Sequence, residues 1–489
     1  MRVWILYTQY MVPEDNKNHN KMYSTGKKKP NLIALFMLTM SGVVALGVVV
    51  FLVYGFATGH PALSGKKNDA QTESTIVHVD ADSSVAVASE DAYTGREPIS
   101  ADDPAVLGAQ SADGEKEADA SEQSEAENDG SLKSRYSGVY ERFGDDLDDP
   151  EYLAANKIYV LESRDADPEN VTLTFGGDIL FDDEYAVTAR LLQNGGEISA
   201  GIDPALIDMM HASDITMVNN EFPYSFGGSP TPEKTYTFRA DPPTVRYLSD
   251  MGVNAVGIAN NHAFDFGEQA FADTLTTLEE AGMPYCGGGR NIKDASAPLY
   301  FVIDDIKVGI IAATQIERLD NPDTRGATDS QSGVFRCLNP TRLLETVTAA
   351  RSKCDFLVVF IHWGTESTNE IDWLQTDQAP KIAEAGADLI IGAHPHVLQG
   401  IGTSKGVPVF YSLGNFWFNS KELDTCLVKA TLSKPESGRS AIRNLKFIPC
   451  RQVGCRTYPA SGEERDRIIA DMRALSPGVN IDSEGSVTY

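Results

Sequence analysis

Six short apolar runs in the second half of the chain each end at a cluster of polar residues, and this pattern constrains the fold more than any other feature. The runs cover residues 171–175, 215–218, 255–259, 356–361, 389–392 and 407–411. Runs of this length that are rich in β-branched residues are typical of buried strands. Segments with helical apolar spacing alternate with them, at residues 204–211, 243–251, 268–281, 340–350 and 375–385. The alternation predicts an α/β domain with parallel strands.

The C-terminal part of the chain adds a few further elements. Two strand-like segments lie between residues 425 and 450, and residues 463–475 have the spacing of an amphipathic helix. Residues 314–339 are polar and lack periodicity, which predicts a surface loop or an insertion.

An uncharged apolar segment lies far upstream of this domain. Residues 32–57 are mostly Leu, Val, Ala, Phe, Met and Gly, and no formal charge falls within residues 31–65. About 20 apolar residues in a helix are enough to span a bilayer. Three lysines at residues 27–29 come directly before the segment, and such a basic excess keeps that end in the cytoplasm. We therefore expect a single-pass membrane anchor with the C-terminal domain outside the cell. A cleaved secretory signal is the alternative and leaves the compartment unchanged.

The segment after the anchor is strongly acidic. Residues 61–130 hold 17 acidic and 4 basic residues, a net charge of −13, and a single aromatic residue, Tyr93. Such a composition buries too little apolar surface to offset its ordering entropy, so we expect disorder. The segment is either a spacer extended by its own charge or a passive linker. The net charge of −29 for the whole chain argues against nucleic-acid binding, which needs a basic face.

These features predict five parts of the chain. They are a cytoplasmic segment (1–30), a transmembrane anchor (31–59), an acidic disordered linker (60–165), the α/β domain (166–457), and a C-terminal helix with a polar tail (458–489). Met11 and Met22 are alternative start positions. The six cysteines form no metal-binding spacing. Cys450 and Cys455 flank a four-residue loop and are either a disulfide or two free thiols.

The polar clusters after the runs contain metal-binding residue types. His394 and His396 follow the run at 389–392, and His362 follows the run at 356–361. In an extended chain, residues i and i+2 face the same side, so both imidazoles of the His-x-His pair can reach one site. Three unrelated loop histidines are the alternative.

Oxygen ligands follow three other runs. Asp178 and Glu221 offer carboxylates, and Asn261 offers an amide oxygen. In open α/β sheets, ligand sites collect beyond the carboxyl ends of the strands. The sequence therefore predicts one site for one or two divalent ions, and a mixture of imidazole and carboxylate suits Mn, Zn or Fe.

His262 follows the run at 255–259 and is predicted to donate a proton to a leaving group. Asp265 either orients that imidazole through a hydrogen bond or caps the next helix. Lys234, Tyr236 and Arg239 lie in a segment that alternates like a strand. We expect them to face an anionic substrate; an edge strand with solvated charges is the alternative.

Six motifs together resemble the CapA (PgsA) family of capsule-synthesis proteins. They are Gly177-Asp178, Asn219-Asn-Glu221, Ala259-Asn-Asn-His262-x-x-Asp265, His362-Trp-Gly-x-Glu366, Gly392-Ala-His394-Pro-His396-Val-Leu-Gln399 and Tyr411-Ser-Leu-Gly-Asn-Phe416. They occur in matching order over roughly residues 170–420. The resemblance implies a part in poly-γ-glutamate synthesis and export, and a membrane anchor followed by an extracellular domain. Its relation to calcineurin-like metallophosphoesterases implies a four-layer sandwich of two sheets flanked by helices.

The resemblance also implies a role for each site residue. Asp178 and His396 would bind the first metal ion, and Glu221 would bridge two ions. Asn261, His362 and His394 would bind the second ion, and His262 would be the general acid. Leu180 departs from the pattern, because phosphoesterases of this class carry a histidine there. Glu366, which we assign to substrate binding, is also the residue that could replace the missing ligand.

Three functions follow as hypotheses. The first is a membrane-anchored extracellular protein of capsule or poly-γ-glutamate biosynthesis, with the cell membrane and other membrane subunits of a synthesis or export complex as partners. The second is an extracellular phosphoesterase unrelated to polymer. The third is a non-catalytic subunit that keeps the site for binding. A catalytic member would use metal-activated water against a phosphoester or an amide, so its substrate would be an anionic polymer or a phosphoester.

Overall fold

The computed structural model describes residues 130–164, 170–317, 324–434 and 439–489. The predicted cytoplasmic segment, the predicted anchor at 31–59 and the predicted linker up to residue 129 lie outside the described residues. Within the described ranges, no helix combines the length and the apolarity that crossing a membrane requires.

Two large sheets form the centre of the described part of the chain. Sheet A has the strand order β1-β7-β8-β10-β11-β13-β12. Its strands are β1 (Ile158–Val160), β7 (Leu299–Ile303), β8 (Ile306–Thr314), β10 (Phe356–His362), β11 (Leu389–Ala393), β12 (Ile401–Ser404) and β13 (Val407–Phe410). Sheet B has the order β17-β16-β15-β2-β3-β4-β5, with β14 paired to β2. Its strands are β2 (Asn170–Ile179), β3 (Ile215–Asn220), β4 (Ala255–Gly257), β5 (Tyr285–Cys286), β14 (Asn415–Trp417), β15 (Leu423–Ser433), β16 (Ala441–Val453) and β17 (Arg456–Pro459).

All six runs predicted as strands are confirmed, as β2, β3, β4, β10, β11 and β13. They pair in parallel within each sheet: β2 with β3 and β3 with β4, and β10 with β11 and β11 with β13. The two strands predicted between residues 425 and 450 are β15 and β16, which pair in antiparallel fashion. Within the polar stretch at 314–339, the short β9 (Gly333–Val334) pairs with β6 (Gly288–Gly289). The carboxyl ends of the parallel strands in each sheet therefore lie together at one edge.

The predicted helices are also present. They are α6 (Pro204–His211), α7 (Arg246–Asp250) after a short 3-10 turn, α8 (Gly267–Glu280), α10 (Thr341–Arg351), α11 (Trp373–Ala385) and α12 (Gly462–Leu475). Local sequence fixes two of the starts. Asp203 caps α6 by accepting a hydrogen bond from Ala205 N at 3.0 Å. Asp372 and Gln375 form a capping box at α11. Two further helices, α5 (Ala186–Gln193) and α9 (Ile292–Ala295), were not predicted.

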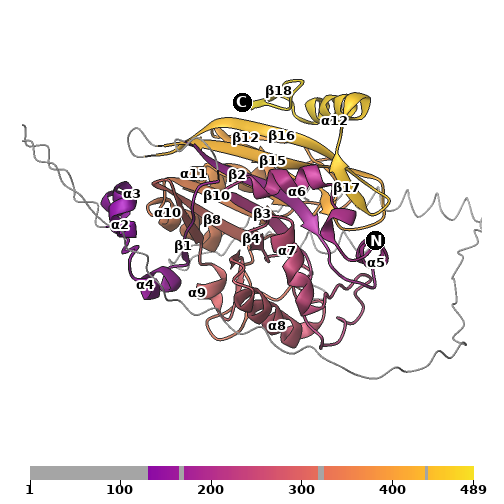
Figure 1. Cartoon of the computed structure of the whole chain (residues 1–489), viewed down its shortest axis with the longest axis horizontal. Coiled ribbons are helices and arrows are strands. Elements are labelled where there is room, and N and C mark those ends of the chain that lie inside the picture. Colours follow the sequence, from indigo (N-terminus) through magenta and orange to yellow (C-terminus); the bar gives the residue numbers. More distant parts are fainter. Residues whose placement is uncertain (1–129, 165–169, 318–323, 435–438) are drawn as a thin grey trace, which may run out of the picture. The chain divides into compact units, whose positions relative to one another are not determined.

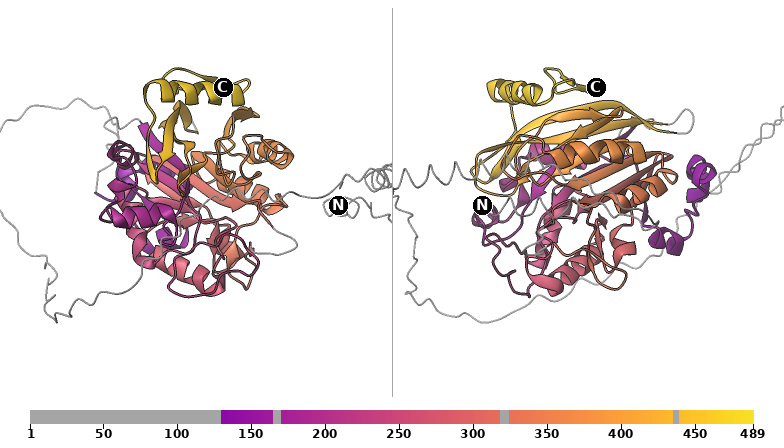
Figure 2. Two further views of the ribbon diagram at one scale, coloured as in Figure 1. Left: turned by 90° about the vertical axis from the view of Figure 1, so that its right-hand side faces the viewer. Right: turned by 180° about the vertical axis from the view of Figure 1, so that it is seen from behind.

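Apolar side chains hold the sheets and helices together in three layers of core. The first layer lies between the sheets, where the rings of Phe175 and Phe360 are 6.4 Å apart. The second packs α5, α6, α7 and α8 on the outer face of sheet B, and the third packs α10 and α11 on sheet A. Figure 1 shows the two sheets between α8 and the C-terminal α12, and the rear view of Figure 2 shows α10 and α11 across sheet A. The arrangement is an α/β fold with two sheets flanked by helices.

The structure differs from the predicted domain boundary at residue 166. Helices α2 (Leu132–Arg135), α3 (Ser137–Phe143) and α4 (Pro150–Ala155) precede β1, and β1 pairs with β7. Tyr136, Val139 and Leu147, in these helices and the turns between them, are buried in the core of sheet A. The predicted linker 60–165 therefore gives way to folded chain by about residue 132, because apolar and aromatic residues return there after the acidic run. At the other end, α12 packs Ile468 and Met472 into the same apolar cluster as Phe175 and Phe360, so the C-terminal segment is also part of the fold.

All six cysteines lie in the described residues, and each is a buried free thiol. Cys450 lies within β16, and its thiol donates to Ile448 O at 3.4 Å. Of the two alternatives for Cys450 and Cys455, the structure has the free thiols.

Candidate metal centre

The six predicted metal ligands meet where the carboxyl ends of the two sheets face each other. Asp178 lies in β2 and Glu221 directly follows β3. His362 is the last residue of β10, and His394 directly follows β11. Three overlapping groups have ligand atoms that all lie within 4.8 Å of one another. They are Glu221–His362–His394, Asp178–Glu221–His396 and Glu366–His394–His396.

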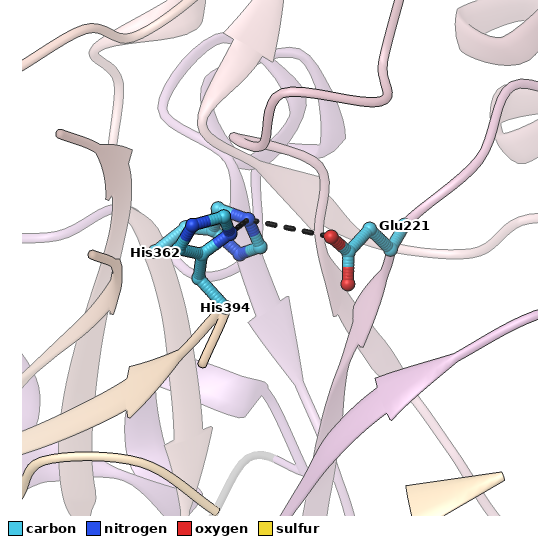
Figure 3. A group of neighbouring side chains, drawn as sticks. All are labelled: Glu221, His362 and His394. Carbon is cyan, nitrogen blue, oxygen red and sulfur yellow. Dashed lines mark hydrogen bonds and ion pairs between the residues drawn. The ribbon is translucent and has the colours of Figure 1, made fainter. Parts of the chain in front are cut away.

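The inner position is built around His362 Nε2. This atom lies 3.4 Å from Glu221 Oε1, 2.8 Å from Asn261 Oδ1 and 3.1 Å from His394 Nδ1. Figure 3 shows the two imidazoles side by side with the Glu221 carboxylate pointing toward them. Four donor atoms thus converge on one small volume that is shielded from solvent.

The outer position is built around His396. Its Nδ1 lies 3.2 Å from Asp178 Oδ2 and 2.8 Å from Asn415 Oδ1, and its Nε2 lies 3.9 Å from Glu221 Oε1. Glu221 therefore faces both positions. This is the place that the sequence predicted for a bridging carboxylate.

Two carboxylate oxygens in the site lack a hydrogen bond. Asp178 Oδ2 and Glu221 Oε1 are fully buried, and neither accepts a hydrogen bond from any described part of the chain. A buried acceptor without a partner is costly and calls for an ion, a water or a functional explanation. These two oxygens face imidazole nitrogens, so the donor set fits a divalent transition metal.

The electrostatics of the site favour the protonation states that suit metal binding. Burial first, and then the neighbouring imidazoles, hold the pKa of His362 and of His394 well below the ordinary value, so both rings are neutral. Burial and the nearby Asp178 charge raise the pKa of Glu221 well above its ordinary value. Burial lowers the pKa of His396, but Asp178, Glu366 and Asn415 together outweigh this effect and the net shift is upward. Neutral imidazole is the form that binds metal, and a cation would relieve the repulsion between the two carboxylates.

The backbone of the His-Pro-His turn is not extended, contrary to the geometry we predicted for it. Strand β11 ends at Ala393, and His394 and His396 have φ angles of +99° and +60°. Positive φ is unfavourable for residues other than glycine and is concentrated at functional sites. The two rings reach one site because the turn folds back, and not because alternate residues of a strand share a face.

Three asparagines beside the ligands, Asn219, Asn260 and Asn415, form a supporting network that the sequence did not predict. Asn219 Nδ2 donates to Asp178 Oδ1 at 2.8 Å and lies 3.2 Å from His362 Nδ1. Asn260 in turn donates to Asn219 Oδ1 at 3.1 Å, and Asn415 contacts His396. The signal was present in the two Asn-Asn pairs that directly follow apolar runs of the sequence, since a side chain with both donor and acceptor can hold a ligand in position.

His262 lies beside the site with its imidazole already oriented. Its Nδ1 is 2.6 Å from Asp265 Oδ2, and its Nε2 is 3.9 Å from Glu221 Oε1. Helix α8 has Phe266 as its N-cap residue, with no side-chain capping bond, so Asp265 orients the imidazole and does not cap the helix. Burial, outweighing the attraction of Asp265, lowers the pKa of His262.

Lys234 occupies a different place from the one we predicted. Its Nζ donates to Asp265 Oδ1 and to Asn261 O, both at 2.6 Å, and the side chain is buried. Asp265 also accepts from Phe238 N at 2.7 Å. Lys234 thus extends the chain of contacts His262–Asp265–Lys234 and does not point toward solvent.

The other predicted substrate residues lie around the site. Residues 234–239 form no strand, so the strand-like alternation was misleading there. Tyr236 is 63% exposed. The Arg239 guanidinium donates to Gly227 O at 3.3 Å and lies over the ring of Phe266. Glu366 is exposed and has a carboxylate oxygen near the rings of His394 and His396.

Comparison with known proteins gives a family. The model of a family described as bacterial capsule synthesis protein PGA_cap matches residues 172–420, a range that contains every residue of the site described above. The PGA biosynthesis protein CapA of Bacillus subtilis (strain 168) is 27% identical over 293 residues, which cover 59% of this chain and 74% of that protein. The capsule biosynthesis protein CapA of Bacillus anthracis is 33% identical over 206 residues, which cover 40% of this chain and about half, 48%, of that protein. Among solved structures, the 5'-nucleotidase of Candida albicans SC5314 aligns with a TM-score of 0.31 and 10% identity, covering 59% of this chain and 53% of that one.

Proposed function

This chain belongs to the bacterial capsule synthesis protein family PGA_cap, and from that membership we propose that it takes part in synthesis or export of a capsule polymer of the poly-γ-glutamate type through a metal-binding site. The proposal rests on the overlap of the family match with the cluster of predicted metal ligands. The family match ends at residue 420 and begins at residue 172, and the convergent His, Asp, Glu and Asn side chains all fall inside it.

The residues that would hold the metal are those of the inner and outer positions. Glu221, His362, His394 and Asn261 would hold one ion, and Asp178, Glu221 and His396 would hold another. A divalent ion there would polarise a phosphoryl or carbonyl oxygen of a bound substrate. The support is the pair of buried carboxylate oxygens without hydrogen bonds, together with neutral imidazoles.

His262 is the residue best arranged to move a proton. Asp265 takes the hydrogen bond of Nδ1, and this leaves Nε2 as the atom that gains or loses the proton on the side facing the site. Lys234 and Phe238 N hold Asp265 in place, so the imidazole has a fixed orientation. A histidine with an orienting carboxylate is a common general acid or base.

The location follows from the upstream sequence. The uncharged run at 32–57 and the lysines at 27–29 support an anchor in the cell membrane with the folded domain outside the cell. An anionic polymer, or a phosphoester linked to its synthesis, would then be the substrate. Other membrane subunits of a synthesis or export complex would be the partners.

Complementation tests this function. In the bacterium that encodes the chain, deletion of the gene should lower cell-associated capsule polymer, and the wild-type chain should restore it. The double variant His394→Ala with His396→Ala should fail to restore polymer and should lose metal in elemental analysis. His211→Ala is the matched control, because His211 is an exposed histidine on α6, away from the site. Restoration of polymer by the double variant would contradict the proposal.

A hydrolytic role is the second candidate, and the oriented pair of His262 and Asp265 favours it. A protein that only binds polymer has no need for an imidazole held in one tautomer. The full chain should then hydrolyse a chromogenic phosphodiester in the presence of Mn²⁺, and His262→Ala should keep the metal but lose turnover. Metal-loaded wild-type protein without turnover on phosphoester or amide substrates would favour the binding subunit instead.

A further inference from the structure

Four rings form a continuous row along one side of the metal centre. The centroid of the Phe238 ring lies 4.3 Å from that of the His262 imidazole, and the centroid of the Phe418 ring lies 5.0 Å from that of the His396 imidazole. The two phenylalanine rings meet edge to face, with centroids 5.2 Å apart and planes at 89°. The row therefore runs from the predicted proton donor to a ligand of the outer position.

Each phenylalanine is held by a hydrogen bond from its own backbone. Phe238 N donates to Asp265 Oδ2 at 2.7 Å, and the same oxygen lies 2.6 Å from His262 Nδ1. Phe418 N donates to Gln452 Oε1 at 2.9 Å, and Gln452 is fully buried. Phe238 thus acts on one imidazole in two ways. Its backbone holds the carboxylate that orients His262, and its ring packs against the imidazole.

The position of Phe238 does not come from a sheet, because residues 231–239 form no strand. Contacts with the segment that follows β2 hold it instead. The ring of Tyr185 meets the ring of Phe238 edge to face at 4.9 Å, and Arg239 N donates to Asp182 Oδ2 at 2.7 Å. Edge-to-face aromatic pairs have a preferred geometry, so these contacts give the Phe238 ring a defined orientation.

We propose that Phe238 and Phe418 form an aromatic bridge that fixes the imidazoles of His262 and His396 relative to each other. The inference rests on the proposed function, from which it takes the roles of the two histidines. Both phenylalanines are positioning residues, because a hydrocarbon ring neither binds the metal nor transfers a proton. A general acid acts efficiently only when it is held at the right distance from the group that it serves. The aromatic bridge provides that spacing from outside the set of metal ligands.

Carbethoxylation of histidine by diethyl pyrocarbonate tests the inference. The full chain is treated in chelator, and the rate at each histidine is followed by mass spectrometry of its peptides. Phe238→Leu removes the ring but keeps the backbone bond to Asp265, so the rate at His262 should rise by about fivefold or more, since a buried group reacts through local opening. The rate at His396 should also rise, by roughly twofold, although Phe418 is the ring that packs against His396.

Phe418→Leu should give the mirror image of this result, with the larger increase at His396 and the smaller one at His262. Phe238→Tyr retains an aromatic ring and should keep both rates close to those of wild type. Phe271→Leu is the matched control. Phe271 is a fully buried phenylalanine of the same apolar cluster, it lies on α8, and its ring stacks on Phe264. This variant should leave both rates unchanged.

The outcomes separate the inference from the proposed function, because the labelling needs neither metal nor turnover. If each leucine variant changes only the histidine that its own ring contacts, the contacts are independent and the aromatic bridge is wrong. If Phe271→Leu raises both rates as much as Phe238→Leu does, general loosening of the core explains the result and the inference is also wrong. If the expected pattern is found in a protein that binds no divalent metal, the proposed function fails while the aromatic bridge stands.

Discussion

Strands β8 and β10 join two regions that both bury charged side chains. At their amino ends lies a cluster that we call the base cluster, made of Arg142, Asp145, Lys307 and Asp355. At the carboxyl end of β10 lies the metal centre. A strand of seven residues is roughly 20 Å long, so the two regions are well separated in one sheet.

The base cluster has a protein partner for each carboxylate oxygen. Asp355 Oδ1 accepts from Arg142 Nε at 2.8 Å, and its Oδ2 accepts from Arg142 Nη2 at 3.0 Å and from Lys307 N at 2.8 Å. Asp145 accepts from Tyr152 Oη at 2.9 Å and from Lys307 Nζ. These contacts fasten the segment at 130–160 to sheet A.

The metal centre differs because only one oxygen of each of its two buried carboxylates accepts a hydrogen bond. Asp178 Oδ2 and Glu221 Oε1 accept no hydrogen bond from the described residues, and the two histidines of the turn have positive φ. The comparison teaches that burial of charge alone does not mark a functional site. The mark is burial of charge that the chain leaves unmatched, combined with backbone strain.

The largest expected effect is on the base cluster. Lys307 is only 2% exposed, and Lys307→Ala leaves Asp145 buried without its cation. Removing one partner of a buried ion pair costs about 3–5 kcal/mol, so urea unfolding should show a free energy of unfolding lower by this amount. The Mn²⁺ stoichiometry should stay that of wild type. Lys307→Met with Asp145→Leu should recover most of the loss. A loss below about 1 kcal/mol would mean that the pair is not structural.

The matching substitution in the metal centre should change the free energy of unfolding in the opposite direction. Glu221→Gln replaces a fully buried carboxyl whose charged form burial and the neighbouring Asp178 disfavour, and one of whose oxygens accepts no hydrogen bond from the described residues. In chelator, the free energy of unfolding should therefore rise by about 1–3 kcal/mol. In saturating Mn²⁺ the variant should instead be less stable than wild type. It loses a ligand and with it the stabilisation by bound metal. Destabilisation in chelator as well would remove the contrast between the two regions.

An intermediate case is Asp182, which is buried but accepts hydrogen bonds from Arg239 N and Glu184 N. Burial raises the pKa of Asp182 to about 6 despite these bonds. Between pH 4 and pH 6 the folded protein binds the proton more tightly than the unfolded chain, so the free energy of unfolding should fall as pH rises through this window. Asp182 should contribute about 1 kcal/mol to this fall after allowance for solvent screening, and Asp182→Asn should remove that contribution. Equal pH dependence in both proteins would contradict the prediction.

The smallest effect on stability should come from Tyr236, which is mostly exposed. Tyr236→Ala should change the free energy of unfolding by less than about 0.5 kcal/mol, because the ring is mostly in solvent. If Tyr236 contacts substrate, the same variant should bind poly-γ-glutamate more weakly in calorimetry. Tyr140→Ala, at an exposed tyrosine of α3, is the control and should leave polymer binding unchanged. Equal binding by wild type and Tyr236→Ala would remove Tyr236 from the substrate residues.

Local patterns in the sequence were sufficient for most of the fold. Continuous β-branched runs have few alternatives to buried parallel strands, and all six formed strands whose polar ends gather at one edge. Among the strands that were missed, β7 and β8 have a local signal. Asp304 and Asp305, both with positive φ, join β7 to β8 in a tight hairpin between two apolar runs. The segment at 132–160 was missed because its composition was judged together with the acidic run before it.

The sequence by itself determined which residue types lie at the strand ends, because strand period and length are local properties. Only the tertiary structure decided how their charges are matched. It placed Lys234 against Asp265 and Asp265 against His262, left one oxygen of Asp178 and one of Glu221 without a hydrogen bond, and brought Glu366 to the His-Pro-His turn. Each of these outcomes depends on contacts between segments tens to hundreds of residues apart, and on which groups exclude water together. Spacing along the chain carries no information about either.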